Sequence, residues 1–129
     1  MGLDMYFYKR KKTYNSFSNC YDQIGYFRKF NALHGYIVKT FADGVDECQE
    51  ILLHKKDIEQ IKKVLDEVLE ANTEEKAKEI LPTQSGFFFG STDYDEFYFE
   101  DVKDAADLMQ NFLDNFDFES YQLVYQASW

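Results

Sequence analysis

Apolar residues recur at helical spacing in three long segments of the chain. Residues 30–41 carry an apolar stripe that includes one histidine, at Phe30, Leu33, His34, Ile37, Val38 and Phe41. Residues 55–71 and 98–116 repeat the spacing of three and four that marks an amphipathic helix. Residues 73–81 add a short helix, since Thr73 suits an N-cap and Pro82 ends the helical pattern. The pattern therefore predicts three long helices and one short one.

Runs rich in aromatic and β-branched residues predict strands between these helices. The runs cover residues 3–8, 48–53 and 120–126. Residues 24–28 form either a further short strand or the lead-in to the first helix. The order of helices and strands predicts an α+β fold, as a single domain over residues 1–129 with a small sheet packed against three to four helices.

Two segments lack a regular period. Residues 13–23 are rich in Ser and Asn and are expected to form a loop. Residues 83–97 hold three consecutive Phe between Gly86 and Gly90, and they form either a buried strand or a loop with exposed rings.

Charge is unevenly distributed along this acidic chain, whose net charge is −10. Residues 1–40 hold seven Lys and Arg against two acids, whereas residues 41–129 hold seven Lys against 22 acids. Direct nucleic-acid binding is therefore not expected, because contacts with phosphate need Lys and Arg. The basic run Lys9–Lys12 is either a solvated turn that protects an edge strand or a nucleic-acid contact. The acidity serves either solubility or attraction to a basic protein surface.

Neither a signal peptide nor a run of ~18 apolar residues is present, so we expect no membrane contact and a cytoplasmic location with free thiols. Signatures such as GxxxxGK[ST], HExxH, GxSxG and CxxC are missing as well. These absences weaken the hypothesis of an enzyme without removing it.

His34 and Cys48 are the candidate metal ligands, and zinc is the candidate cofactor because imidazole and thiolate are its usual partners. A structural zinc site needs four ligands, and no paired spacing supplies the others. The alternative is a core histidine that is hydrogen-bonded to a backbone carbonyl.

An acidic cluster with neighbouring rings is the second candidate site. Seven carboxylates fall within residues 93–107, and Glu100, Asp104 and Asp107 share one helical face. The cluster is a solvated face, a docking face for a basic protein that could imitate DNA phosphates, or a site for a hard cation. Aromatic anchors rimmed by charge are typical of an interaction hot spot. The predicted interaction surface comprises Phe88, Tyr94, Asp95, Glu96, Glu100, Asp101, Asp104 and Asp107.

Four segments resemble a family of small proteins found mainly in phages and prophages. They read MGLDMY, IGYFRKFNALH, GVDECQE and LPTQSGFFFGSTDYDEFYFEDVKD, and the last is the most specific. The resemblance carries over no catalytic residues. It implies a phage accessory protein in the bacterial cytoplasm that binds a host protein, such as an anti-phage nuclease of the CRISPR type, without catalysis. The alternatives are a metal-binding protein, a small metal-dependent enzyme using His34 and Cys48 or the acidic cluster, and a virion component.

Overall fold

The computed structural model describes residues 2–12, 22–86 and 89–129 of the chain. Within these ranges the elements are β1 (Asp4–Lys11), β2 (Asp22–Arg28), α1 (Asn31–Phe41), β3 (Ile51–Leu53), α2 (Lys55–Ala71), α3 (Glu74–Ile80), α4 (Glu96–Asn115) and β4 (Tyr121–Ser128). The predicted α+β fold is confirmed, and residues 24–28 belong to a strand.

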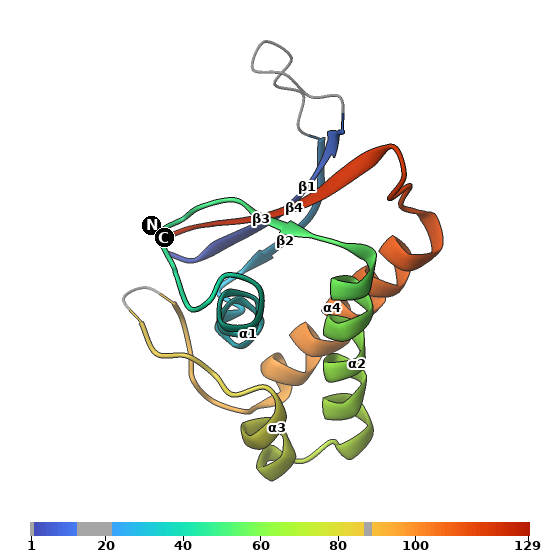
Figure 1. Ribbon diagram of the computed structural model, residues 1–129. Helices are drawn as coiled ribbons and strands as arrows, with labels where there is room; N and C mark the ends of the chain where they lie inside the picture. Colours follow the sequence, from blue (N-terminus) through green and yellow to red (C-terminus); the bar gives the residue numbers. More distant parts are fainter. Residues whose placement is uncertain (1, 13–21, 87–88) are drawn as a thin grey trace.

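All four strands form one antiparallel sheet in the order β2-β1-β4-β3. The first and last strands of the chain are therefore neighbours at its centre, and Asp4 pairs with Ser128. This pairing brings the two ends of the chain side by side (Figure 1).

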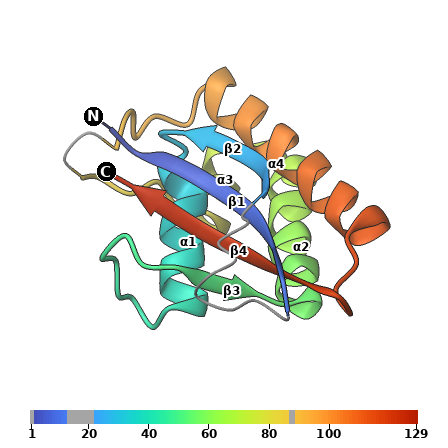
Figure 2. The ribbon, with the colours of Figure 1, turned by 90° about the horizontal axis from the view of Figure 1, so that it is seen from above.

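The helices cover one face of the sheet (Figures 1 and 2). Alternate residues of β1 point into this layer, so that Met5 and Phe7 are fully buried. The Phe7 ring lies 5.8 Å from that of Phe112 on α4 and 5.2 Å from that of Tyr125 on β4. Packing of α2 against α4 completes the core. The hydrophobic effect of burying this face joins the two layers.

The described helices all lie on one side of the sheet (Figure 2), and tyrosines of β1 and β2 pack against one another on the other side. The Tyr6 ring lies 5.7 Å from that of Tyr8 and 5.4 Å from that of Tyr26, between ring centroids. The Tyr26 hydroxyl donates a hydrogen bond to Asp4. Successive residues of β1 thus point to opposite faces of the sheet, with Met5 and Phe7 in the core and Tyr6 and Tyr8 on the other face.

Two predicted features are wrong in detail. The strand predicted over residues 48–53 begins only at Ile51, and Cys48 has a φ of 58°, outside the β region. The basic run Lys9–Lys12 is not a turn beside an edge strand, because residues 9–11 belong to β1 and β1 lies between β2 and β4.

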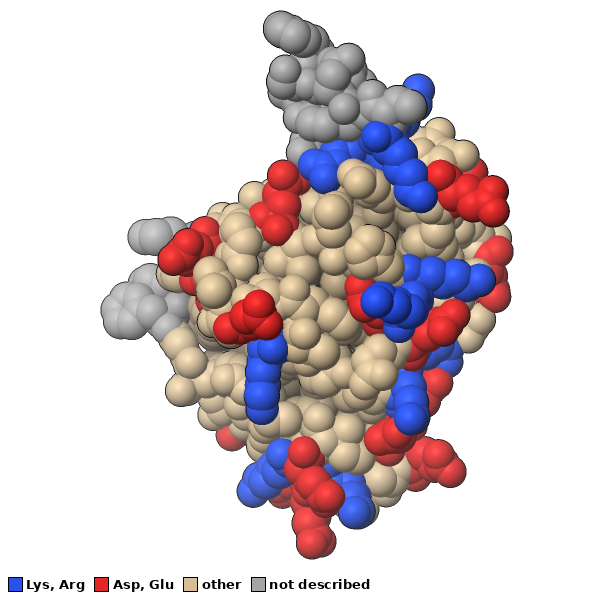
Figure 3. All heavy atoms as spheres, in the orientation of Figure 1, with Lys and Arg blue, Asp and Glu red and all other residues tan. Residues whose placement is uncertain are grey.

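Charged side chains of both signs are interspersed over the helical layer in the view of Figure 3, and basic ones gather near the end of β1. Among the described residues, no helix is both long enough and apolar enough to cross a membrane.

Candidate functional site

A buried hydrogen-bond network is centred on His34, which α1 holds in the core with 2% exposure. Its Nδ1 lies 2.7 Å from the hydroxyl of Tyr125 on β4, and its Nε2 lies 3.0 Å from both carboxylate oxygens of Asp46. One tautomer satisfies all of these contacts: the Tyr125 hydroxyl donates to Nδ1, and the Nε2–H donates to Asp46. Burial raises the pKa of Tyr125 well above its usual value, which keeps its hydroxyl a donor.

Two aromatic rings pack on this network. The indole N–H of Trp129 donates to Asp46 Oδ1 over 3.2 Å. The Phe89 ring stands edge-on to His34, with centroids 5.6 Å apart, and lies 5.9 Å from the Trp129 ring. The Asp46 carboxylate is therefore held by two donors, His34 on α1 and Trp129, which follows β4.

A hollow of about 290 Å³, which we call the Asp46 pocket, opens beside this network. Its wall comes from α1, from the loop before β3 and from the segment that follows α3, with Gly35, Lys39, Asp46, Gln84 and Phe89 among its lining residues. Gly35 leaves the room that the Gln84 side chain occupies, since a Cβ built there would stand 2.3 Å from Gln84 Cγ. The Asp46 side chain, which is 29% exposed, is accessible from this side.

Residues 83–86 and 89–95 have no helix or strand, and buried polar groups hold them against α1. The Asn31 side chain accepts a hydrogen bond from Gln84 N over 2.8 Å and donates to the carbonyl of Ser91 over 2.8 Å. The hydroxyl of Tyr94, a predicted surface residue, accepts from Thr83 N over 2.9 Å. The Tyr94 hydroxyl thus helps to hold this loop in place through its hydrogen bond with Thr83.

The acidic half of the predicted surface lies on the first turns of α4. Asp95 caps the helix by accepting hydrogen bonds from the N–H groups of Phe97 and Tyr98, both over 3.1 Å. The side chains that follow on the exposed side are Glu96, Phe97, Glu100 and Asp104. Phe97, which the sequence reasoning did not select, is 65% exposed. Phe97 precedes Glu100 and Asp101 by three and four positions, and this helical spacing could have assigned it to the predicted surface.

Asp101 differs from these neighbours because it is partly buried, at a second hollow of about 280 Å³ between the starts of α1 and α4 that Asp95 and Phe97 also line. Partial burial, followed by repulsion from Asp104, Glu100 and Asp95, raises its pKa to about 6. Asp107, one turn further along α4, forms an exposed ion pair with Lys103.

Phe88, a member of the predicted interaction surface, lies outside the described residues. Gln126 donates a side-chain hydrogen bond to the backbone carbonyl of Cys48 over 3.0 Å. Within the part of the chain that the structure describes, no three His, Cys, Asp or Glu side chains are placed to share a metal ion.

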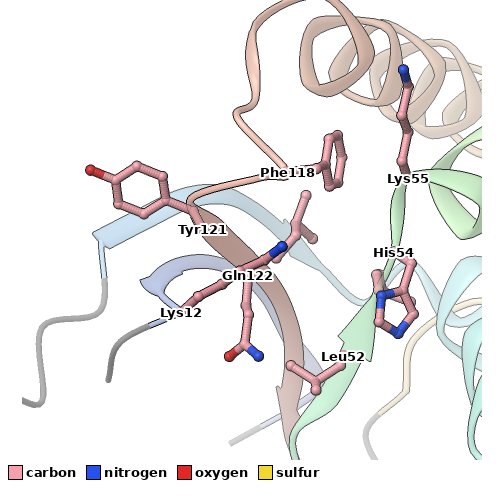
Figure 4. A pocket seen from close by; sticks show the side chains of 9 residues that line it. Lys12, Leu52, His54, Lys55, Phe118, Tyr121 and Gln122 are labelled. Atoms are coloured by element: carbon pink, nitrogen blue, oxygen red, sulfur yellow. The ribbon is translucent and has the colours of Figure 1, made fainter. Parts of the chain in front are cut away.

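A smaller hollow of about 130 Å³ lies where β3 passes into α2 (Figure 4). Leu52 and His54 flank it on one side, and Phe118 and Gln122 on the other. The ammonium of Lys55 points away from it. This hollow contains none of the residues of the two sites above.

Comparisons with models of protein families, with curated proteins and with solved structures gave no match.

Proposed function

We propose that this chain is a non-enzymatic binding protein that docks onto a basic surface of another protein. The docking site is the α4 surface, which we define as Glu96, Phe97, Glu100, Asp101 and Asp104. The observation that carries the proposal is a phenylalanine ring that is 65% exposed on a helix whose neighbouring exposed side chains are carboxylates.

Exposed aromatic rings are costly in water and are typical anchors of protein interfaces. The carboxylates around Phe97 would steer a basic partner to it, because complementary charge speeds encounter. The raised pKa of Asp101 comes first from burial and then from repulsion by Asp104, Glu100 and Asp95, and this second cause supports a concentration of negative charge here. A bound cation would relieve the repulsion.

The resemblance to phage and prophage proteins adds the class of partner to this proposal. A phage accessory protein acts inside a bacterium, so the partner would be a host protein. A defence nuclease, such as a CRISPR effector, is the specific candidate because its nucleic-acid channel is basic. Glu100 and Asp104 stand one helical turn apart and would take the place of phosphates there.

Affinity capture from a lysate of the bacterial host tests the proposal. The wild-type protein should retain one host protein in stoichiometric amount, and retention should fall as salt rises. The double variant Phe97→Ala, Glu100→Gln should lose at least ten-fold of that protein. Both changed side chains are exposed, so circular dichroism should show an unaltered fold.

The matched control carries Glu67→Gln and Glu70→Gln, which neutralise two exposed carboxylates on α2. It should retain the partner as the wild type does. Equal retention by the α4 double variant would place the interface elsewhere. A folded wild-type bait that retains no protein at any salt concentration would refute the binding function itself.

A further inference from the structure

The geometry points to the Asp46 pocket as a binding site for a ligand that carries a primary ammonium or guanidinium group. This site is separate from the α4 surface and does not depend on the proposed function. Its distinguishing feature is the Asp46 carboxylate, which the protein holds in place without filling all of its hydrogen-bond acceptor positions.

Every hydrogen bond of the network runs toward Asp46. The Tyr125 hydroxyl donates to His34, and His34 and Trp129 donate to the carboxylate. Neither nitrogen of His34 is left to serve a ligand, so the imidazole acts by positioning Asp46. Three fixed groups behind one carboxylate are the kind of support that preorganises a binding residue.

The carboxylate keeps unused acceptor capacity. Oδ1 accepts from His34 and Trp129, whereas Oδ2 accepts only from His34 among the described contacts. A carboxylate offers about four acceptor positions. The free positions belong to a side chain that lines the pocket and is 29% exposed.

Donors of opposite charge suit these positions best, because charge-assisted hydrogen bonds are stronger than neutral ones. Phe89 supplies an aromatic wall for the carbon atoms that bear the charge. Lys39 also lines the pocket, yet no ion pair joins it to Asp46. The pocket therefore has room for a cation that its own lysine does not provide, and Lys39 should weaken binding by repulsion.

Trp129 is the single tryptophan of the chain, and it touches Asp46 directly. Its fluorescence, together with the NMR signal of its indole N–H, reports on the surroundings of Asp46. The probes are n-butylammonium chloride, methylguanidinium chloride and the neutral isostere n-butanol, each at constant ionic strength set with sodium chloride. We expect saturable changes with the two cations and at least ten-fold weaker binding of n-butanol.

Three variants assign the binding to the pocket. Asp46→Asn should weaken n-butylammonium binding at least ten-fold, Lys39→Gln should tighten it about three-fold, and Glu47→Gln, on the adjacent exposed residue, should leave it unchanged. Ser85→Phe blocks the pocket without removing any member of the network, so it separates lost binding from a damaged fold. It should also abolish binding.

The inference is overturned if the folded wild type shows no saturable change with either cation. It is also overturned if n-butanol binds as well as n-butylammonium, or if Asp46→Asn and Ser85→Phe both keep wild-type affinity. An acetylated, amidated Gly-Lys-Gly peptide then identifies the source of the group. Binding ten-fold tighter than that of n-butylammonium assigns the pocket to a lysine side chain of a protein, and equal or weaker binding assigns it to a free amine.

Discussion

Asp101 shows how the environment of one residue sets its chemistry. It has the same side chain as Asp95 and Asp104, but unlike them it is partly buried, and burial combines with the charges of its neighbours to raise its pKa to about 6. In the unfolded chain the same group titrates near ~3.9. Between pH ~3.9 and about 6, the Asp101 carboxyl is therefore protonated to a greater extent in the folded state than in the unfolded state.

Neutralising this residue should stabilise the protein in a pH-dependent way. The stability that Asp101 contributes as a protonated acid is fully present below pH ~4 and is lost as the pH rises through about 6. Asp101→Asn should therefore raise the free energy of unfolding at pH 7.5 by about 1 kcal/mol, after allowance for solvent screening of a partly exposed group. At pH 4 it should change little. Urea unfolding at both pH values measures the difference.

Glu59→Gln is the control for this comparison, because Glu59 is an exposed carboxylate on α2. It should leave stability nearly equal at both pH values. A gain for Asp101→Asn that is the same at pH 4 and pH 7.5 would mean that charge is not its cause.

At the scale of elements, α4 has an exposed side that forms the proposed docking surface and a buried side that packs in the core. Its first turn depends on Asp95, which satisfies two backbone N–H groups that the helix itself leaves unpaired. The same residue adds charge to the start of the helix, where a negative group is favoured by the helix dipole.

Substitutions at this cap should separate its two contributions. Asp95→Ala should lower the free energy of unfolding by about 1 kcal/mol, because the capping hydrogen bonds are lost. Asp95→Asn should stay within about 0.5 kcal/mol of the wild type, since Asn caps almost as well. Thermal or urea unfolding compares the three proteins. Equal losses for both variants would show that charge, and not capping, stabilises this end of the helix.

Local pattern predicts most elements of this fold. The periodicity of residues 55–71 matches α2 residue for residue, and Thr73 caps α3 as expected, by accepting from Lys76 N over 3.2 Å. The sequence leaves residues 83–97 open between strand and loop, and the described part is a loop up to the helix start at Glu96. Its shape depends on Asn31, which is more than fifty residues away. No local period reports such a contact.

The same limit applies to the candidate sites. His34 is predicted as either a zinc ligand or a core histidine bonded to a backbone carbonyl, whereas its observed partners are the side chains of Asp46 and Tyr125. Tyr125 is 91 positions away and lies in a strand pattern that suits any β-former. The acidic surface was easier to predict, because helical spacing alone brings Glu100 and Asp104 together.

At the scale of the whole molecule, a single contact layer holds the sheet to the helices. Phe112 is central to it, with 3% exposure and a ring that reaches Phe7 in the middle strand. Among the described residues, every helix lies on the same side of the sheet, so no second layer of helices compensates for a loss here (Figure 2).

Phe112→Ala should therefore lower the free energy of unfolding by about 3–5 kcal/mol, through lost burial and the cavity it leaves. That is a large share of the ~5–15 kcal/mol of an ordinary domain. Phe97→Ala, on the same helix but exposed, should change it by less than about 0.5 kcal/mol. Urea unfolding of both variants tests this contrast. Similar losses for both would mean that Phe97 is packed in solution.

The adjacency of β1 and β4 has a consequence for the order of the chain itself. Because Asp4 and Ser128 face each other across the centre of the sheet, a short flexible linker could join the two ends as a hairpin turn. New ends could then be opened at Asn72, which is exposed between α2 and α3. Such a circular permutant would keep every pairing of the sheet while reading its elements from α3 round to α2. The packing of the elements in this fold should therefore tolerate more than one position of the chain ends.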